Sequence, residues 1–397
     1  MFSKNSSNSH EYLDITQHEI EALKFEYNLA DAHTHQSQSP TQEKIVERLP
    51  DLWHEAEKTK QGDMEKRFIE AFFRSQRQNT ALTTPTMLVY AASIGMVAIA
   101  NYLMKKKMSV ALLHPCFDNI HDILKHMHIP LEPLEENWLH DSEKIYDNLK
   151  KHVKADALFV IDPNNPTGFT LTGSAKDPEE TKRGFMELFR YAKDHNKLLL
   201  FDFCFASFLL PGTELGIFEI YKELEDSGVS YITIEDTGKT WPLQDTKVAI
   251  IKTSKDLHDE IYNIHTSYLL NVSPFILNLV SQYIEDSIKD SFASVHDLLS
   301  RNRETAKREL KNSLLEFQEP KTNVSVAWFK ITDPNIKATD LQKAILTKGV
   351  YVLPGTYFFW NDQEQGQHYI RIALARNTNM FEPAIKLVRE ALDEYGK

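Results

Sequence analysis

The sequence predicts an α/β fold, in which a large domain built on a mostly parallel sheet is followed by a smaller α+β domain. The chain has 397 residues, of which 42% are apolar and 26% charged. This composition is typical of soluble globular proteins, and the length exceeds what one hydrophobic core usually holds. Apolar runs of strand length alternate with amphipathic stretches along the middle of the chain, and a shorter alternation follows near its C-terminus. Continuous apolar strands separated by helices indicate a parallel sheet covered on both faces.

The first forty residues are rich in His and Gln, and we expect one short helix in them and two more after them. A short helix is predicted over 16–26, because Thr16 followed by Glu19 has the form of a capping box. Further helices are predicted over 41–57 and 64–76. Residues 1–45 are expected to form a segment ahead of the large domain.

The large domain is expected over 46–285. Its predicted strands are 87–90, 109–113, 157–161, 197–202, 231–235 and 247–252, with helices such as 94–107, 179–195 and 217–226 between them. The nearly uncharged stretch 87–104 is about long enough to span a bilayer. Its small and polar residues favour a buried strand, turn and helix instead. Sheets of this kind bind ligands beyond the carboxyl ends of their strands.

The smaller domain is expected over 286–397. It is predicted to begin with a long polar helix over 286–316. Strands over 324–331, 350–353 and 369–375 then alternate with helices over 338–348 and 381–395. This order indicates an α+β domain.

The charge and cysteine content exclude several classes of protein. Lys and Arg number 45 and Asp and Glu 57, so the net charge is −12. Nucleic-acid binding, which needs clustered cations, is therefore not expected. The two cysteines exclude a disulfide framework and a zinc site with three or four thiolates, and the histidines lack metal-ligand spacing, so no metal is assigned. Residues 1–7 lack the apolar core of a signal peptide, and a cytoplasmic protein without a membrane span is expected.

Polar residues follow several of the predicted strands. Residues 162–168 form a loop rich in Pro and Asn, Asp202 ends a Leu-rich strand, and Lys239 follows another strand. Considered one at a time, the loop is an ordinary turn, Asp202 could cap the next helix and Lys239 could be a solvated loop residue. Arg371 lies within an apolar strand, where an arginine is costly unless it is paired. Together they form a constellation that needs a common chemical explanation.

In their order and their placement, Asn165, Asp202, Lys239, Lys247 and Arg371 resemble the residues of the pyridoxal-5′-phosphate (PLP) enzymes of the aminotransferase type, which have fold type I. The resemblance implies that Lys239 holds the cofactor aldehyde as a Schiff base. Asp202 would keep the pyridine nitrogen protonated, so that the ring accepts electrons from the substrate, and Asn165 would hydrogen-bond the ring oxygen.

The same resemblance assigns the remaining contacts of the cofactor and the substrate. Phe117 would stack on the ring face. The cofactor phosphate would lie at the helix N-terminus that contains Ser93, with Thr237 and Lys247 as side-chain partners. Arg371 would clamp the α-carboxylate of an amino acid through a bidentate pair.

Two features depart from ordinary aminotransferases. Three residues after the pyridine aspartate, these enzymes usually carry a tyrosine, and this chain has Phe205. The N-terminal residues 28–36 are also unusual. The chain resembles the PLP-dependent L-arginine oxidases and hydroxylases, which use dioxygen. The resemblance extends over nearly the whole chain and is carried by residues 29–33, 114–120 and 234–242.

This narrower resemblance implies that the N-terminal segment closes over the occupied site as a lid. His33 would be a base or would position water, and Thr16 would contact the reacting centre. Glu19 and Asp31 are the carboxylates expected to meet a guanidinium, which offers planar paired donors and stays charged. Asp236 is a further candidate, either for this contact or for shaping the loop around Lys239.

The implied reaction consumes L-arginine and dioxygen and releases ammonia and hydrogen peroxide. The product would be 4-hydroxy-2-ketoarginine, 4,5-dehydro-2-ketoarginine or both, along with 2-ketoarginine; the sequence leaves their balance open. A homodimer is expected from the family.

Three alternatives remain. The first is a conventional aminotransferase for a basic amino acid, against which Phe205 and residues 31–33 argue. The second is a PLP-fold regulator, which would need an attached DNA-binding domain that the first forty or so residues do not provide. The third is a non-enzymatic scaffold, which would leave Lys239 without a reason to follow a strand.

Overall fold

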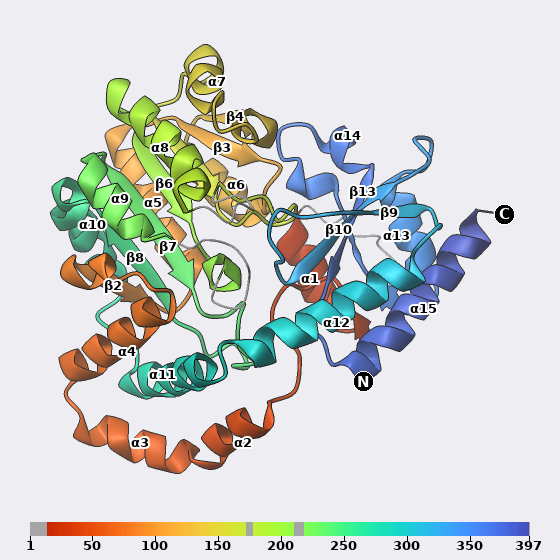
Figure 1. The fold of residues 1–397 in the computed structure, drawn as a ribbon, viewed down its shortest axis with the longest axis horizontal. Helices are drawn as coiled ribbons and strands as arrows, with labels where there is room; N and C mark the ends of the chain where they lie inside the picture. The colour runs from red at the N-terminus through yellow and green to blue at the C-terminus, as the bar shows by residue number, and fades with distance from the viewer. Residues whose placement is uncertain (1–13, 172–177, 210–217, 397) are drawn as a thin grey trace, which may run out of the picture.

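The computed structural model describes residues 14–171, 178–209 and 218–396, and it confirms the predicted fold class. Figure 1 shows two sheets, a larger one surrounded by helices α5, α8, α9 and α10 and a smaller one packed with α12, α13 and α15. The expected boundaries at 45 and 285 stay predictions. The predicted signal-free N-terminus and the start of the N-terminal segment lie outside the described residues.

Within the described ranges, the larger sheet has seven strands in the order β2-β8-β7-β6-β5-β3-β4. The strands are β2 (Thr86–Val89), β3 (Val110–His114), β4 (Leu131–Glu135), β5 (Ala157–Ile161), β6 (Leu198–Asp202), β7 (Tyr231–Asp236) and β8 (Ala249–Thr253). The neighbouring strands β4 and β3, β3 and β5, β5 and β6, and β6 and β7 run parallel to each other. Strand β8 runs antiparallel to both of its neighbours, β7 and β2. All residues of β3, β5 and β8 are buried, which explains their continuous apolar sequences.

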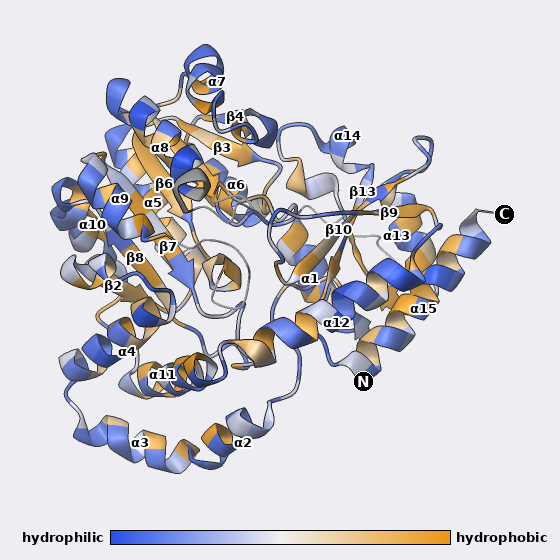
Figure 2. Ribbon diagram, in the orientation of Figure 1, coloured by the Kyte–Doolittle hydropathy of each residue, from blue (hydrophilic) through white to orange (hydrophobic). Residues whose placement is uncertain are grey.

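Helices connect these strands and cover the sheet. They are α5 (Ala92–Lys106), α6 (Asp118–His126), α7 (Ile145–His152), α8 (Pro178–Asp194), α9 (Ile220–Ser227) and α10 (Lys255–Tyr268). Figure 2 shows apolar strands inside this shell and polar residues on the outer faces of the helices. The uncharged stretch 87–104 is divided between β2 and α5, as predicted. None of the helices in the described part of the chain has the length and apolar character needed to cross a membrane.

The N-terminal helices differ from prediction in two places. Helix α1 (Ile15–Ala22) is capped by Asp14, whose carboxylate accepts a hydrogen bond from the backbone N–H of Gln17 at 2.7 Å. The capping box expected at Thr16 is therefore wrong, because Asp14 already provides a favourable N-cap and places Thr16 inside the first turn.

The single helix expected over 41–57 is likewise wrong. The chain forms α2 (Pro40–Glu47) and α3 (Leu49–Lys58), separated at Arg48 and followed by α4 (Gln61–Ser75). Pro50 lies in the first turn of α3, where its missing N–H does no harm, whereas inside a continuous helix it would remove a hydrogen bond.

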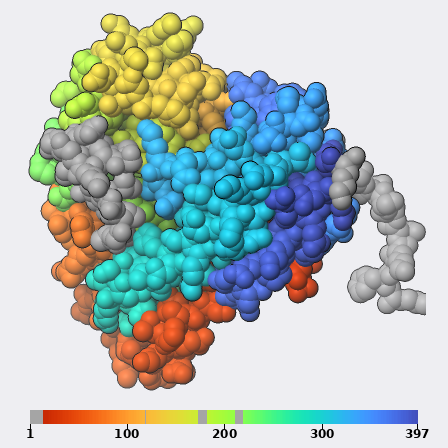
Figure 3. Space-filling model, turned by 45° about the vertical axis from the view of Figure 1, so that its right-hand side comes forward, coloured from red at the N-terminus to blue at the C-terminus, as the bar shows by residue number. Residues whose placement is uncertain are grey.

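The long helix expected over 286–316 is also wrong. Helix α11 (Pro274–Lys289) covers the first residues of that range and ends, α12 (Ala293–Glu309) begins after a break, and the chain then enters β9 (Leu315–Gln318). Ser291 and Phe292 take left-handed backbone angles, with φ of 56° and 61°, and the Phe292 side chain is buried at the break. Figure 3 shows this segment, in cyan, across the centre of one face of the molecule.

The smaller sheet has the antiparallel order β12-β13-β10-β9 among the described residues. The other strands of this sheet and the helices next to it are β10 (Val326–Ile331), α13 (Ala338–Leu346), β12 (Leu353–Pro354), α14 (Gln363–Gly366), β13 (Tyr369–Ala373) and α15 (Thr378–Tyr395). The N-terminal strand β1 (Tyr27–Asn28) pairs with β11 (Val350–Tyr351) in the same direction. Helix α1 buries Ile15 and Ala22 in an apolar cluster with Trp328 and Phe358 of this region. The N-terminal segment therefore packs on the smaller sheet, next to its strand β13.

Candidate active site

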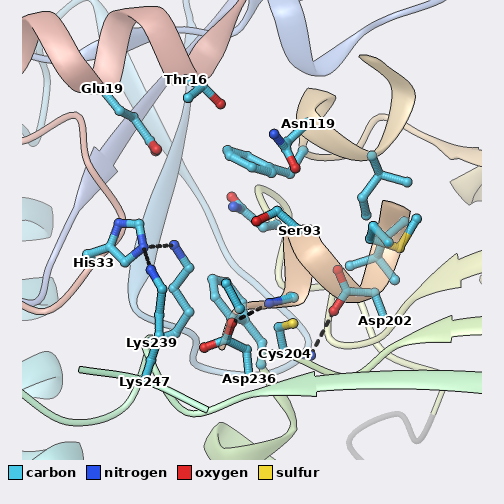
Figure 4. A pocket seen from close by; sticks show the side chains of 18 of the residues that line it. Thr16, Glu19, His33, Ser93, Asn119, Asp202, Cys204, Asp236, Lys239 and Lys247 are labelled. Atoms are coloured by element: carbon cyan, nitrogen blue, oxygen red, sulfur yellow. Dashed lines mark hydrogen bonds between the residues drawn. The ribbon is translucent and has the colours of Figure 1, made fainter. Parts of the chain in front are cut away.

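A cavity of about 230 Å³ lies at the carboxyl ends of the parallel strands, beside the N-terminus of α5. Parallel sheets of this kind present their ligand sites at this edge. The cavity brings together most of the residues predicted for the site: Thr16, Glu19, His33, Ser93, Phe117, Asn165, Asp202, Lys239 and Lys247. Phe205 also lines it. In Figure 4, Thr16 and Glu19 extend into the cavity from α1, opposite the strand ends.

Lys239 and Lys247 meet at one imidazole ring. The Nζ atom of each lysine lies 3.2 Å from Nε2 of His33, as the dashed lines in Figure 4 show. On the other side of the ring, Nδ1 lies 2.6 Å from Oδ1 of Asp31. Because a carboxylate can only accept, the hydrogen-bond network assigns the ring proton to Nδ1 and leaves Nε2 as an acceptor toward the lysines.

Asp202 is held at the end of β6. Its Oδ1 accepts a hydrogen bond from the backbone N–H of Cys204 at 2.8 Å. Burial raises the pKa of Asp202, and the charge of Asp236 acts in the same direction. A carboxylate in this position is stabilised by a cation, and the protonated pyridine nitrogen of PLP is a cation of the required kind.

The loop after β5 is held by buried hydrogen bonds and places Asn165 at the cavity. Its neighbour Asn164 is fully buried, and its Nδ2 donates to the carbonyl oxygen of Pro115 at 2.9 Å and to Oε2 of Glu136 at 2.7 Å. Gly168 has a φ of +66°, and a Cβ there would come within 2.4 Å of Pro320. The Pro- and Asn-rich motif is therefore both a tight turn and a support for one site residue.

Asp236 links the loop of Lys239 to the start of α5. Its Oδ2 accepts from the backbone N–H of Ala92 at 2.8 Å, and its Oδ1 accepts from that of Gly238 at 2.6 Å. A Cβ on Gly238 would approach Cδ of Lys247 to 2.6 Å, so glycine lets the Lys247 side chain pass over this loop. Ser93, Lys247 and the N-terminus of α5 thus lie together, as an anion-binding site for a phosphate requires.

Three of the predicted site residues do not line the cavity. The first, Thr237, is fully buried beside β8: its hydroxyl donates to the carbonyl oxygen of Val248 at 3.1 Å and accepts from the Val248 N–H at 2.9 Å. These two bonds join the loop of Lys239 to the residue before β8 and occupy the hydroxyl both as donor and as acceptor.

The second, Arg371, is fully buried on β13 and is paired inside the protein. Its Nη2 donates to Oε1 of Glu19 at 2.8 Å and to the carbonyl oxygen of Ala30, and its Nη1 donates to Oδ1 of Asn165 at 3.3 Å. Glu19 and Arg371, which were expected to hold opposite ends of a substrate, hold each other in this state. The ion pair relieves the cost of an arginine in an apolar strand.

The third, Asp31, uses both of its oxygens for histidines. Oδ1 accepts from His33 Nδ1, and Oδ2 lies 2.5 Å from His35 Nε2. Although burial alone would raise the pKa of this carboxyl group, the hydrogen bonds from His33 and His35 and the positive charge of Lys239 hold the pKa far below its usual range. Asp31 therefore stays ionised and orients the two rings.

Sequence reasoning missed several residues that build the site. Arg376 is fully buried and donates to the carbonyl oxygens of Asn28, Asp31 and His33, which fixes the segment that carries His33. The visible signal was a second arginine at the end of the apolar run that contains Arg371. Asn119 and Cys204 also line the cavity, each two positions after a residue assigned from the resemblance.

Comparisons with known proteins show the family of the chain. The family model "Aminotransferase class I and II" matches residues 29–387. A solved structure of MppP soaked with its product 2-ketoarginine is 30% identical, with a TM-score of 0.80, over 92% of this chain and 99% of that one. The aspartate aminotransferase from Thermus thermophilus with maleate has a TM-score of 0.74 at 15% identity, over 98% and 100% of the two chains. At that identity, the likeness shows the fold alone.

Curated relatives match over shorter segments. The aromatic-amino-acid aminotransferase 2 of Thermococcus litoralis is 22% identical over 255 residues, or 62% of this chain and 60% of that protein. The LL-diaminopimelate aminotransferase of Methanosphaera stadtmanae is 40% identical over 68 residues, or 17% of this chain and 14% of that protein. The chain thus spans less than two thirds of the length of these relatives. With the family model covering most of its length, the chain belongs to the class I and II aminotransferases, a family of PLP-dependent enzymes.

Proposed function

We propose that this protein uses PLP and dioxygen to oxidise L-arginine to a 2-oxo acid, with release of ammonia and hydrogen peroxide. The observation that carries the proposal is the placement of His33 from the N-terminal segment at 3.2 Å from Nζ of Lys239. An aminotransferase needs no second base there. Phe205 in place of the usual tyrosine and the 30% identity to MppP, whose product is 2-ketoarginine, support the same conclusion.

The cavity residues fit the cofactor. Bound PLP would supply an electron sink that acidifies the α-carbon of an amino acid. Lys239 would carry the cofactor and take the α-proton, and Asp202 would hold the pyridine nitrogen in its protonated form. Asn165 would bind the ring oxygen and Phe117 would pack on the ring. Ser93, Lys247 and the N-terminus of α5 would bind the phosphate, while Thr237 would support the loop from behind.

The pairing of Glu19 with Arg371 provides a basis for selecting arginine. The α-carboxylate of a substrate can replace Glu19 on Arg371, and the released Glu19 can then take the guanidinium of the same substrate. Glu19 and Arg371 both keep a partner of opposite charge only when the substrate carries a guanidinium as well as an α-carboxylate. Such an exchange disfavours amino acids with uncharged side chains, because they would leave the Glu19 carboxylate without a cation.

Helix α1 acts as the lid in this proposal. It places Thr16 and Glu19 over the cavity and packs its apolar face on the smaller sheet. Covering the cavity protects an electron-rich reacting centre from protonation by bulk water. His33 and Thr16 are then the polar groups from the N-terminal segment that can position dioxygen or water.

The direct test is to measure the uptake of dioxygen by PLP-loaded protein with L-arginine and no 2-oxo acid. We expect steady uptake together with ammonia and peroxide. One dioxygen per ammonia corresponds to 2-ketoarginine, and two correspond to the hydroxylated or the dehydro product, which mass spectrometry distinguishes. Turnover that starts only after a 2-oxo acid is added would identify the second candidate, a conventional aminotransferase for a basic amino acid, which the family membership favours.

Replacing His33 tests its part in the reaction. His33→Ala should leave α-proton removal by Lys239 largely intact and shift the product from the hydroxylated toward unhydroxylated forms, because the group that positions water is lost. The measurement is the product ratio by mass spectrometry at equal arginine consumption. A product ratio equal to that of the unaltered protein would remove His33 from the mechanism.

The proposal includes a homodimer, because active sites in this family are usually built at a two-fold interface. Sedimentation of the PLP-loaded protein at micromolar concentration should give about twice the mass of one chain. A mass of 45.9 kDa would correspond to the single chain and would contradict the dimer.

A further inference from the structure

One carboxylate in this molecule is shared by two histidines. Asp31 accepts from His33 with Oδ1, at 2.6 Å from Nδ1, and meets Nε2 of His35 with Oδ2, at 2.5 Å. The side chain of Asp31 is 6% exposed, whereas that of His35 is 39% exposed. The unit formed by His33, Asp31 and His35, which we call the bridged histidine pair, thus runs from Lys239 toward solvent.

The surroundings hold the bridged histidine pair in place. Arg376 binds the carbonyl oxygens of Asp31 and His33, and the hydroxyl of Thr34 donates to the carbonyl oxygen of Trp241 at 2.5 Å. The backbone N–H of His35 donates to the carbonyl oxygen of Ala375 at 3.0 Å, and that of Ser37 donates to Oδ1 of Asn377 at 2.7 Å, so the backbone is also held at His35 and after it. A fixed geometry of this kind is what an orienting group needs.

His33 separates two cavities. One is the cavity of Lys239. The other, of about 120 Å³, has His33, Thr34, His35 and Asp245 among its lining residues. Exposed Asp245 reaches within 4.0 Å of Nε2 of His33. His35 therefore faces a space outside the proposed reaction chamber.

Several charged groups surround the ring of His33. Lys239 and Lys247 donate to its Nε2, Asp245 approaches from the loop before β8, Arg376 lies behind its backbone, and Glu19 lies within 4.8 Å. Among these groups, Asp31 is the carboxylate hydrogen-bonded to the ring. A donor on the second oxygen of Asp31 draws part of that negative charge away from His33 and so favours its neutral form.

We propose that His35 is a positioning residue that acts through Asp31 to keep His33 neutral, with its proton on Nδ1 and Nε2 free to accept. This inference rests on the proposed function, because only an acceptor at Nε2 can take a proton from Lys239 or from water during the oxidation. His35 itself touches neither Lys239 nor the proposed substrate position, so its effect must appear through the pH dependence of His33.

Two substitutions separate this role from a structural one. His35→Ala removes the donor, whereas His35→Gln keeps an N–H that can reach Asp31 but cannot titrate. The matched control is His54→Ala, because His54 is an exposed histidine on α3 whose Nδ1 lies 2.8 Å from Oε2 of Glu57, far from the cavity. All variants are studied as PLP-loaded full chains.

The first readout needs no substrate. The visible absorbance of the PLP–Lys239 linkage is titrated with pH, because the charge on His33 acts directly on the nitrogen of Lys239. We expect the midpoint in His35→Ala to move by about one pH unit, the midpoint in His35→Gln to move by less than half as much, and that in His54→Ala to stay unchanged.

The second readout is the pH profile of arginine oxidation. Without His35, the full charge of Asp31 falls on His33 and favours its protonated form, so the acidic limb of the profile should move to higher pH by a similar amount. His35→Gln should restore most of the rate near neutral pH.

The inference is overturned if His35→Ala has the same midpoint of the absorbance titration and the same acidic limb of the pH profile as the unaltered protein. Equal losses of rate in both His35 variants without a shifted titration would also overturn it, by marking a merely structural contact. If the protein proves to be a conventional aminotransferase, the absorbance titration still decides the role of His35, and the two failures stay distinguishable.

Discussion

Lys239→Ala should abolish the oxidation of L-arginine. The variant loses both the amine that would carry the cofactor and the base that would take the α-proton, and the cavity offers no equivalent at that point. Lys247 lies equally close to His33, at 3.2 Å, but it is expected to bind the phosphate. Loss of a group with both roles typically lowers the rate by a factor of about 10⁴ or more.

The measurement is ammonia release from L-arginine by protein incubated with excess PLP. Lys44→Ala serves as a control, because Lys44 is an exposed lysine on α2, far from the cavity. Sustained product formation by Lys239→Ala would refute the assignment. Loss of the cofactor's visible absorbance in this variant alone would also exclude a non-enzymatic scaffold that binds PLP by other residues.

Glu19→Gln should lower kcat/KM for L-arginine about 100-fold, which corresponds to about 2.7 kcal/mol. The substitution keeps the shape of the side chain and removes the charge that holds Arg371 in the resting state and would hold the guanidinium in the complex. Oxidation of an uncharged analogue, such as L-norleucine, should change by less than about threefold. The selectivity between the two substrates is therefore the quantity to measure.

Glu21→Gln is the matched control for Glu19→Gln. Glu21 lies on the same helix but pairs with exposed Lys24, and we expect its loss to leave both substrates unaffected. Equal losses for arginine and norleucine in Glu19→Gln would show that Glu19 supports the lid without reading the guanidinium, and would contradict the exchange of partners at Arg371.

The strands of the larger sheet could be predicted from the sequence where burial on both faces leaves a continuous apolar run. Strand β5 agrees with its predicted range at both ends. Strand β4 was not predicted, because it lies at the edge of the sheet and its sequence, with Pro133 and two glutamates, carries no such run. The break at Ser291 and Phe292 was missed because neither residue is one that favours a left-handed backbone.

The composition of the candidate site could be predicted, but its internal pairing could not. Lys239, Asp202 and Asn165 follow strands whose carboxyl ends meet, so their convergence on one cavity was predictable. Glu19 and Arg371 are 352 positions apart, and nothing in either local sequence indicates that they form an ion pair. The sharing of Asp31 by two histidines depends on side-chain rotamers, which a sequence pattern does not specify.

The pairing of β1 with β11 has a consequence for the synthesis of the protein. Tyr27 and Asn28 are translated long before their strand partners Val350 and Tyr351 and before Arg376, which donates to the carbonyl oxygen of Asn28. The larger sheet can form during translation, as early parts of a nascent chain generally do. The segment that carries His33 can be fixed next to Lys239 only after β11 and Arg376 have been translated, so this contact forms later than the strands of the larger sheet.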